Sequence, residues 1–365
     1  MKVQLETGEL EVHGGRDELL QSLTGFGSRP NKKRGFVFVS KVLGHRYPTK
    51  PSDMADIYKQ LAALIEPELD NQPTMVIGLV EAAAGLGCGV YHHLNAPDSF
   101  YMHTTYYRLD RPIWLTFQEE HSHAPTHFLY DVEDNEQLLD LRSRVKNVVI
   151  IDDEYSTGKT LVNFAEKLRQ NLPSVEKIIS AAILDWVPNK LPGIDSVSLF
   201  KGGFSFNWKP GIELDNPSTA GNQTQILDDI IPDNFGRLGT QGVNIDCETY
   251  VDIEHFRDKK VLVLGTGECM YQAFVIGEYL ENGGVDVYVQ ATSRAPYNVD
   301  VDLKSKITFK DNYSENIDNF FYNPQRYDSI LICYETSSTP ENHDLPEQLE
   351  AFAPEVITLF IRPAG

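Results

Sequence analysis

A strand followed by a short polar loop, residues 148–160, constrains this chain more than any other segment. Four β-branched residues at 148–151 are typical of a buried strand, and they lead directly into two carboxylates, Asp152 and Asp153. The following loop is rich in Ser, Thr and Gly, and residues 161–168 have the pattern of a helix. Such a loop directs several backbone N–H groups at one point, with the positive end of a helix dipole behind it. The segment therefore predicts a phosphate-binding loop.

The carboxylates and the loop together indicate a phosphorylated pentose, because carboxylates accept hydrogen bonds from a sugar diol beside the phosphate. The segment resembles the phosphoribosyl-diphosphate (PRPP) motif of type I phosphoribosyltransferases. The resemblance implies that Asp152 and Asp153 hold the ribose hydroxyls during catalysis. It also implies that PRPP is bound by Glu154, Tyr155, Ser156, Thr157, Gly158, Lys159 and Thr160.

A nucleotide-binding P-loop is the nearest alternative interpretation, because Gly158-Lys159-Thr160 matches the last three positions of that motif. The motif also requires a glycine five residues before the second glycine, and that position is Asp153. A carboxylate there would lie against the nucleotide phosphates. The PRPP interpretation is favoured, and an accidental strand–turn–helix is the remaining alternative.

The composition of the chain limits its organisation and its partners. The 365 residues are enough for two domains, each with its own core. With 32 Lys+Arg against 53 Asp+Glu the net charge is −21, which opposes general binding of nucleic acid; residues 29–34 are the one basic cluster. The four cysteines lack CxxC spacing, so neither a disulfide framework nor a zinc site is indicated. Without a signal peptide or a run of ~18 apolar residues, we expect a cytoplasmic protein that does not associate with a membrane.

Strands are expected to alternate with helices, which implies α/β architecture with parallel sheets covered on both faces. The first unit has expected strands at 35–44, 74–79, 148–151, 177–185 and 197–206, and helices at 51–69, capped by Ser52, and 161–170. A polar, aromatic excursion covers 96–125. The second unit has strands at 259–264, 285–290, 307–309, 329–334 and 356–361, with a helix at 271–282. We expect a phosphoribosyltransferase domain at 1–206, a connection at 207–250 rich in Pro, Gly, Asn and Asp, and a smaller Rossmann-like domain at 251–365.

Two further segments of the first unit are candidates for PRPP contacts. The loop after strand 74–79 occupies the place of the diphosphate loop of type I enzymes, and its small residues let backbone amides approach phosphate oxygens: Glu81, Ala82, Ala83 and Ala84. An ordinary alanine-rich helix start is the alternative. The excursion lies where these enzymes carry a mobile lid, so Arg108 and Arg111 are candidate cations for the departing diphosphate.

Candidate acceptor or lid contacts come from two places. One is a segment dense in titratable groups, Glu119, Glu120, His121 and His123. A transition-metal site there is a weaker alternative, because Pro125 breaks the helical register that would align the histidines. The other is Ser40-Lys41, since a lysine that interrupts an apolar strand is expected to have a partner or an edge position.

A second anion site is expected in the C-terminal unit, separate from the PRPP site. It would combine two loops that follow neighbouring strands, Gly265, Thr266 and Gly267 with Thr292, Ser293 and Arg294. A tight turn and a surface ion pair are the alternative. The chain here resembles the phosphoribosyltransferase-plus-TRSP proteins found beside bacterial tellurite-resistance (Ter) gene clusters; Thr-Ser-Arg-Ala-Pro at 292–296 is close to the Thr-Arg-Ser-Pro sequence that names the second domain.

The resemblance implies transfer of 5-phosphoribosyl from PRPP to a nitrogenous small-molecule acceptor, with release of diphosphate, in making a nucleoside-like metabolite within a stress-response system. Mg²⁺ is the expected cofactor, held by Asp152 and Asp153 directly or through its waters, because the charge of two departing phosphates must be neutralised. A homodimer is compatible with the resemblance, since type I enzymes are often dimers. The alternative is a non-catalytic protein that binds PRPP and regulates a stress response.

Overall fold

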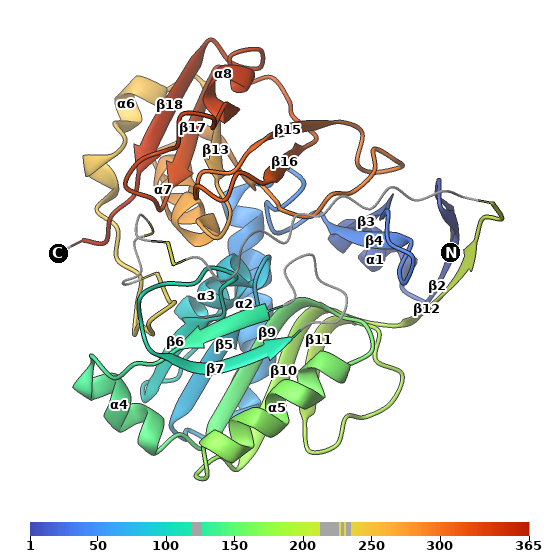
Figure 1. Cartoon of the computed structure of the whole chain (residues 1–365), viewed down its shortest axis with the longest axis vertical. Helices are drawn as coiled ribbons and strands as arrows, with labels where there is room; N and C mark the ends of the chain where they lie inside the picture. Colours follow the sequence, from blue (N-terminus) through green and yellow to red (C-terminus); the bar gives the residue numbers. More distant parts are fainter. Residues whose placement is uncertain (119–125, 212–225, 228–229, 231–234, 365) are drawn as a thin grey trace.

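The computed structural model describes residues 1–118, 126–211, 226–227, 230 and 235–364. Two α/β layers occupy the lower and upper parts of the molecule in Figure 1, with the N-terminal strands to one side. Each α/β layer is built on a parallel sheet, as the alternation of strands and helices predicted. Among the described residues, the helices are too short or too polar to cross a lipid bilayer.

The first sheet has five parallel strands in the order β11 (Asp195–Lys201), β10 (Lys177–Asp185), β9 (Asn147–Tyr155), β5 (Thr74–Gly78) and β6 (Ser99–His103). Strand β9 is central and contributes to a core on each face: Val149 and Ile151 to one, Val148 and Ile150 to the other. This arrangement explains its unbroken apolar run, because alternate side chains of a strand point to opposite faces and both faces are covered.

Helices cover both faces of this sheet. Helices α2 (Pro51–Ile65) and α3 (Ala83–His93) share one core with it. The other core includes α4 (Glu136–Ser143), α5 (Lys159–Asn171) and the hairpin of β7 (Ile113–Gln118) and β8 (Thr126–Tyr130). A 3-10 turn, η1 (Glu66–Glu68), follows α2.

The prediction of a polar excursion at 96–125 was wrong in part, because strands β6 and β7 lie within that segment.

The N-terminal region forms a separate β layer. Strands β1 (Lys2–Gln4), β2 (Gly8–His13) and β12 (Gly203–Trp208) form one antiparallel sheet, while β3 (Thr24–Ser28) and β4 (Phe36–Ser40) form a hairpin after α1 (Asp17–Leu23). The strand predicted at 197–206 is two strands: β11 stays in the parallel sheet, and after Gly202 the chain crosses to pair with β2. Phe38 stacks on Trp186 with ring centroids 4.5 Å apart, which joins the hairpin to the first sheet.

The second sheet has four parallel strands in the order β14 (Asp286–Ala291), β13 (Lys260–Gly265), β17 (Ser329–Tyr334) and β18 (Glu355–Phe360). Helix α7 (Met270–Asn282) packs on β13 and β14. The hairpin β15 (Lys306–Lys310) and β16 (Asp318–Tyr322), with α8 (Leu345–Leu349), lies near the other face. The short elements η2 (Cys247–Thr249) and α6 (Ile253–Phe256) precede β13.

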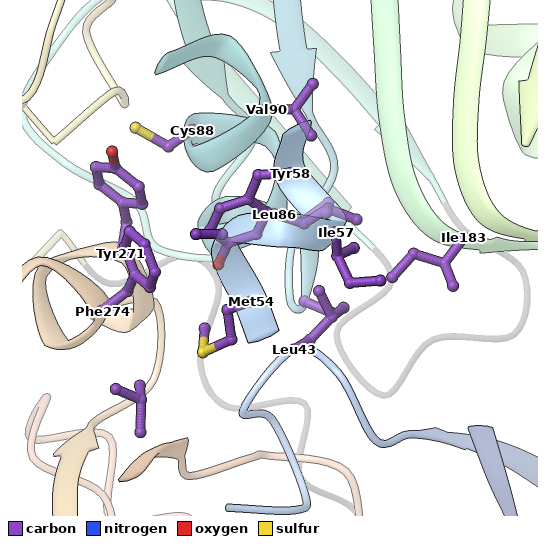
Figure 2. Packing of buried hydrophobic residues seen from close by; sticks show 14 of the residues in the cluster. Leu43, Met54, Ile57, Tyr58, Leu86, Cys88, Val90, Ile183, Tyr271 and Phe274 are labelled. Carbon is purple, nitrogen blue, oxygen red and sulfur yellow. The ribbon is translucent and has the colours of Figure 1, made fainter. Parts of the chain in front are cut away.

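The two α/β layers share one hydrophobic core. Figure 2 shows Tyr58 of α2, Cys88 of α3 and Phe274 of α7 meeting between the sheets. The rings of Tyr58 and Phe274 are 5.1 Å apart in an edge-to-face arrangement. The cluster that contains β9 also contains β13, so the two units share this core in addition to the separate clusters on their outer faces, and the division into two domains stays a prediction. This shared core fixes the second layer beside the loops that follow β5 and β9.

The first long helix begins differently from the sequence prediction. Lys50 is its N-cap and makes no side-chain cap, and Pro51 occupies the first turn. The backbone N–H and the hydroxyl of Ser52 donate to the Glu281 carboxylate at 2.7 and 3.0 Å. The predicted Ser52 cap is thus wrong, because a carboxylate from α7 engages that serine.

Candidate functional site

The phosphate-binding loop predicted at 156–160 forms the turn after β9, and its last two residues begin α5. Strand β9 continues to Tyr155, so Asp152 and Asp153 lie within the last residues of the strand and not beyond its end. Gly158 is the N-cap of α5 with φ +75°, a left-handed conformation that glycine adopts without cost. The Asp153 N–H donates to Asp152 Oδ1 at 2.9 Å, which holds the Asp152 carboxylate at the strand end.

Two adjoining cavities open at this strand end. The smaller, about 80 Å³, lies over the loop and is lined by Ser156, Thr157, Gly158 and Thr160. The larger, about 170 Å³, is lined by Asp152, Asp153 and Glu154. They share several lining residues: Arg29, Arg34, Val80, Asp152, Glu154 and Ser156. The pair has room for a phosphate in one compartment and a longer polar group in the other. Tyr155 lines the smaller cavity, whereas Lys159 lines neither.

The basic cluster of the sequence forms one wall of both cavities. Arg34 binds the Glu154 carboxylate through one nitrogen at 2.6 and 2.9 Å, and its guanidinium lies over the Phe36 ring at 4.7 Å. Burial raises the pKa of Glu154, although Arg34 opposes that shift. Arg29 also lines both cavities. The β3–β4 hairpin therefore places two cations above the carboxylates of β9.

Glu81, in the turn after β5, is the acidic group at the far side of the larger cavity. It accepts hydrogen bonds from the Ser293 hydroxyl and the Arg294 backbone N–H, both at 3.0 Å. His45 Nε2 lies 3.7 Å from Glu81 Oε2, the oxygen that Ser293 also binds, and Arg46 bonds His45 Nδ1 at 3.0 Å. Burial alone would raise the pKa of Glu81, but His45, Arg46 and the Arg294 N–H outweigh burial and lower that pKa to about 2. Burial and Arg46 together lower the pKa of His45.

The turn that carries Glu81 is held by the excursion as well. The Val80 N–H donates to the Thr104 hydroxyl at 3.0 Å, and the Tyr106 hydroxyl donates to the Val80 carbonyl at 3.1 Å. The Val80–Glu81 peptide bond is cis. Of the four residues predicted to contact diphosphate, Glu81 and Ala82 line the cavity, whereas Ala83 and Ala84 are buried in the first turn of α3.

Several predicted site residues lie elsewhere. Arg108 and Arg111 are exposed, and neither lines either cavity; the Arg108 carbonyl accepts from the Leu227 N–H at 2.8 Å. The structure thus does not bring them to the site, and arginines from β3–β4, from the segment after β4 and from the segment after β14 line the larger cavity instead. Ser40 and Lys41 also line neither cavity. The Ser40 hydroxyl accepts from the Val42 N–H, and Lys41 donates to the Gln21 carbonyl at 3.1 Å. Glu119, Glu120, His121 and His123 lie outside the described residues.

The separate anion site predicted in the C-terminal unit is wrong. The two loops do meet at one sheet edge, since the Gly267 N–H donates to the Thr292 hydroxyl at 3.0 Å. However, Thr266 is buried and bonded to the Cys333 carbonyl, and Gly267 packs against Tyr313. Arg294 instead lines the same cavity as the β9 carboxylates. The physical reason is that another cation already occupies the sheet edge.

That cation is Arg237, which is fully buried and comes from the connecting segment. Its guanidinium binds Glu335 in bidentate fashion at 2.6 and 2.7 Å, and Glu268 at 2.6 and 2.9 Å. Burial would lower the pKa of Arg237, but the two carboxylates raise it. Glu268 also accepts from the Thr105 hydroxyl and the Tyr106 N–H. The edge of the second sheet therefore presents carboxylates to an internal arginine, so it is filled by the chain itself.

Sequence reasoning missed five residues of this region: His45, Arg46, Tyr297, Arg237 and Glu335. The Arg46 guanidinium lies 4.7 Å from the Tyr297 ring centre and donates to its hydroxyl at 3.2 Å. Of these five residues, only Arg46 had a sequence signal that could have indicated a site residue, because it is a cation that follows an apolar strand in an acidic chain. Among the described residues, no group of three or more His, Cys, Asp or Glu side chains could hold a metal ion by itself.

Fold and site together define an α/β protein with two adjoining polar cavities at the carboxyl edge of a parallel sheet. Residues 23–195 match the family model described as phosphoribosyl transferase, and residues 243–351 match the model described as TRSP domain C terminus to PRTase_2. The chain carries a phosphoribosyl transferase domain followed by a TRSP domain, which confirms the two domain families of the predicted resemblance. Its class of enzyme is accordingly pentosyltransferase.

Solved structures of similar fold include adenine phosphoribosyltransferase from Rhodothermus marinus, with 19% identity, TM-score 0.36, and coverage of 51% of this chain and 99% of that one. The adenine enzyme of Trypanosoma brucei, in complex with AMP, pyrophosphate and ribose-5-phosphate, has 15% identity, TM-score 0.36, and coverage of 51% and 79%. A hypoxanthine-guanine phosphoribosyltransferase from Bacillus anthracis has 16% identity, TM-score 0.27, and coverage of 41% and 78%. A comparison with curated protein sequences finds no significant match.

Proposed function

We propose that this protein transfers 5-phosphoribosyl from PRPP to a nitrogenous small-molecule acceptor and releases diphosphate. The observation that carries the proposal is the continuity of the two cavities. The loop at 156–160 lines the smaller one, and Asp152 and Asp153 line the larger one directly beside it. A 5-phosphate in the loop would place the ribose diol at the carboxylates.

The reaction exchanges one bond at the ribose. The acceptor nitrogen forms a bond to C1, the bond from C1 to the diphosphate oxygen breaks, and its electron pair leaves with the diphosphate. A proton carried by the acceptor nitrogen is released to solvent or to a nearby base. The carboxylates at the end of β9 stabilise the positive charge that develops on the sugar, and the surrounding arginines stabilise the diphosphate.

Mg²⁺ fits the donor set at the end of β9. Asp152 and Asp153 supply hard oxygen ligands, and Mg²⁺ is usually held by one or two carboxylates together with substrate phosphates and waters. The absence of a complete metal-ligand cluster among the described residues agrees with that mode of binding. When bound, Mg²⁺ would neutralise part of the charge on the departing diphosphate.

Calorimetry with PRPP, with and without Mg²⁺, tests the proposal. We expect binding that depends on Mg²⁺, is lost on chelation, and weakens by at least about tenfold in the Asp152→Asn/Asp153→Asn variant, since each charge-assisted hydrogen bond contributes roughly 1.5–3 kcal/mol. Asp56→Asn on the exposed face of α2 is the matched control. Unchanged binding by the double variant, or no binding by the intact protein, would refute the proposal.

Turnover is tested by diphosphate release in the presence of candidate acceptors. Binding of PRPP without diphosphate release from any acceptor would support the regulatory alternative. A comparison of metabolites in cells with and without the gene would identify the acceptor, and we propose that the product is a nucleoside-like metabolite. Measuring growth of the same cells under tellurite tests the proposed role in a stress response.

A further inference from the structure

The segment that follows β14 reaches out of the second sheet into the transferase cavity. Arg294 lines that cavity and is only 3% exposed, and Ala295 and Tyr297 line it as well. Ser293 and Arg294 bind the two oxygens of the Glu81 carboxylate. These contacts join residues 212 and 213 positions apart in the chain. The wall of the cavity is therefore built by both α/β layers.

The position of Glu81 indicates which part of PRPP would contact this wall of the cavity. Strands β5 and β9 are neighbours and parallel, so the loops that follow them emerge at the same sheet edge. A PRPP molecule with its 5-phosphate in the loop after β9 and its ribose at Asp152 and Asp153 has only its diphosphate left to place. The remainder of the larger cavity, toward the turn after β5, contains Glu81, Arg46 and Arg294.

An ionised Glu81 would repel a diphosphate unless neighbouring groups neutralised it. The Ser293 hydroxyl and the Arg294 N–H bind its two oxygens, and His45, which is bonded to Arg46, lies 3.7 Å from the oxygen that Ser293 binds. The Glu81 carboxylate therefore links the turn after β5 to the segment after β14. This arrangement allows a negative residue in a loop that must face phosphates.

The Arg294 side chain is held in place by two kinds of contact. It forms an ion pair with the buried Glu315 at 3.3 Å, and its guanidinium lies 5.7 and 5.5 Å from the ring centres of Tyr106 and Tyr107. A guanidinium has five N–H groups in a planar fork, more than one carboxylate can accept, so it can bind Glu315 and a phosphate together. Such a fork matches phosphate oxygens in bidentate geometry.

We propose that Arg294 binds the diphosphate of PRPP and that Ser293 positions the Glu81 turn, so the C-terminal layer completes the transferase site. This inference rests on the proposed function. The Thr-Ser-Arg-Ala-Pro segment then serves the PRPP site and has no ligand of its own. Arg294 is a binding residue under this proposal, and Ser293 acts only through Glu81.

A comparison of two ligands tests the proposal on the full-length chain. PRPP and ribose 5-phosphate share the 5-phosphate and the diol, but only PRPP carries the diphosphate. We expect Arg294→Met to weaken PRPP binding by about 10- to 100-fold, the range for losing a charge-assisted hydrogen bond, and to leave ribose 5-phosphate binding unchanged. Arg294→Lys should restore part of the loss, because it keeps the charge but loses the fork.

The control is Arg257→Met, which removes an exposed arginine that is also paired with a glutamate, Glu254. Ser293→Ala is the second variant and should weaken PRPP binding severalfold without affecting ribose 5-phosphate; it decides the question if Arg294→Met does not fold. Equal losses for both ligands would show a general structural effect and overturn the proposal, as would no loss for either. If the unaltered protein binds ribose 5-phosphate but not PRPP, or neither ligand, the proposed function itself fails.

Discussion

Replacing Arg237 by methionine should destabilise the protein strongly. The substitution leaves the Glu268 and Glu335 carboxylates buried without their cation. It also removes the four hydrogen bonds that these carboxylates receive from the guanidinium. Removing one partner of a buried ion pair costs roughly 3–5 kcal/mol.

Urea unfolding at pH 7 measures this loss of stability, with hydrogen exchange at 104–107 and 266–268 as a local readout, because Thr105 and Tyr106 also bind Glu268. Arg257→Met is the control, since its pair with Glu254 is exposed and contributes little. Adding Glu268→Gln and Glu335→Gln to Arg237→Met should recover much of the stability, because the uncompensated charges are then gone. A loss no larger than that of the control, or no recovery on adding the two glutamine substitutions, would refute the reasoning.

Two further substitutions test the site. Gly158→Ala should weaken binding of ribose 5-phosphate and cost about 1–2 kcal/mol of stability, because φ is +75° there and the new Cβ would approach the Leu191 side chain; Gly203→Ala, which meets open space, is the control for calorimetry and urea unfolding. Glu81→Gln should cost on the order of 3 kcal/mol at pH 7, since the folded pKa of about 2 lies below the ordinary 4.5. That stability is present above pH 4.5 and is lost as the pH falls toward 2, so urea unfolding of variant and unaltered protein should converge across that range. A constant difference would contradict the pKa.

Local sequence patterns determined much of the fold and the core of the candidate site. Strands 177–185 and 329–334 were predicted with the bounds that the structure has, because their apolar runs are bounded by polar or turn-forming residues. The segment 148–160 indicated strand, carboxylates, loop and helix together, since all of its determinants lie within one short stretch of chain. Its strand was predicted five residues too short, one at the start and four at the end, because two aspartates and a glutamate have low strand propensity and only pairing with β10 keeps them extended.

The assignment of charged residues to partners was decided by the tertiary structure alone. Arg237 and Glu335 are 98 residues apart, and Thr105 and Glu268 are 163 apart. Periodicity indicates which side chains are buried, but a buried charge also needs a partner, and no local pattern names a partner on another element. The sequence indicated that the loops at 265–267 and 292–294 share a sheet edge, because both follow neighbouring strands. It did not indicate that Arg294 lines the transferase cavity or that Arg237 lies at that edge, because the packing of the two layers decides both.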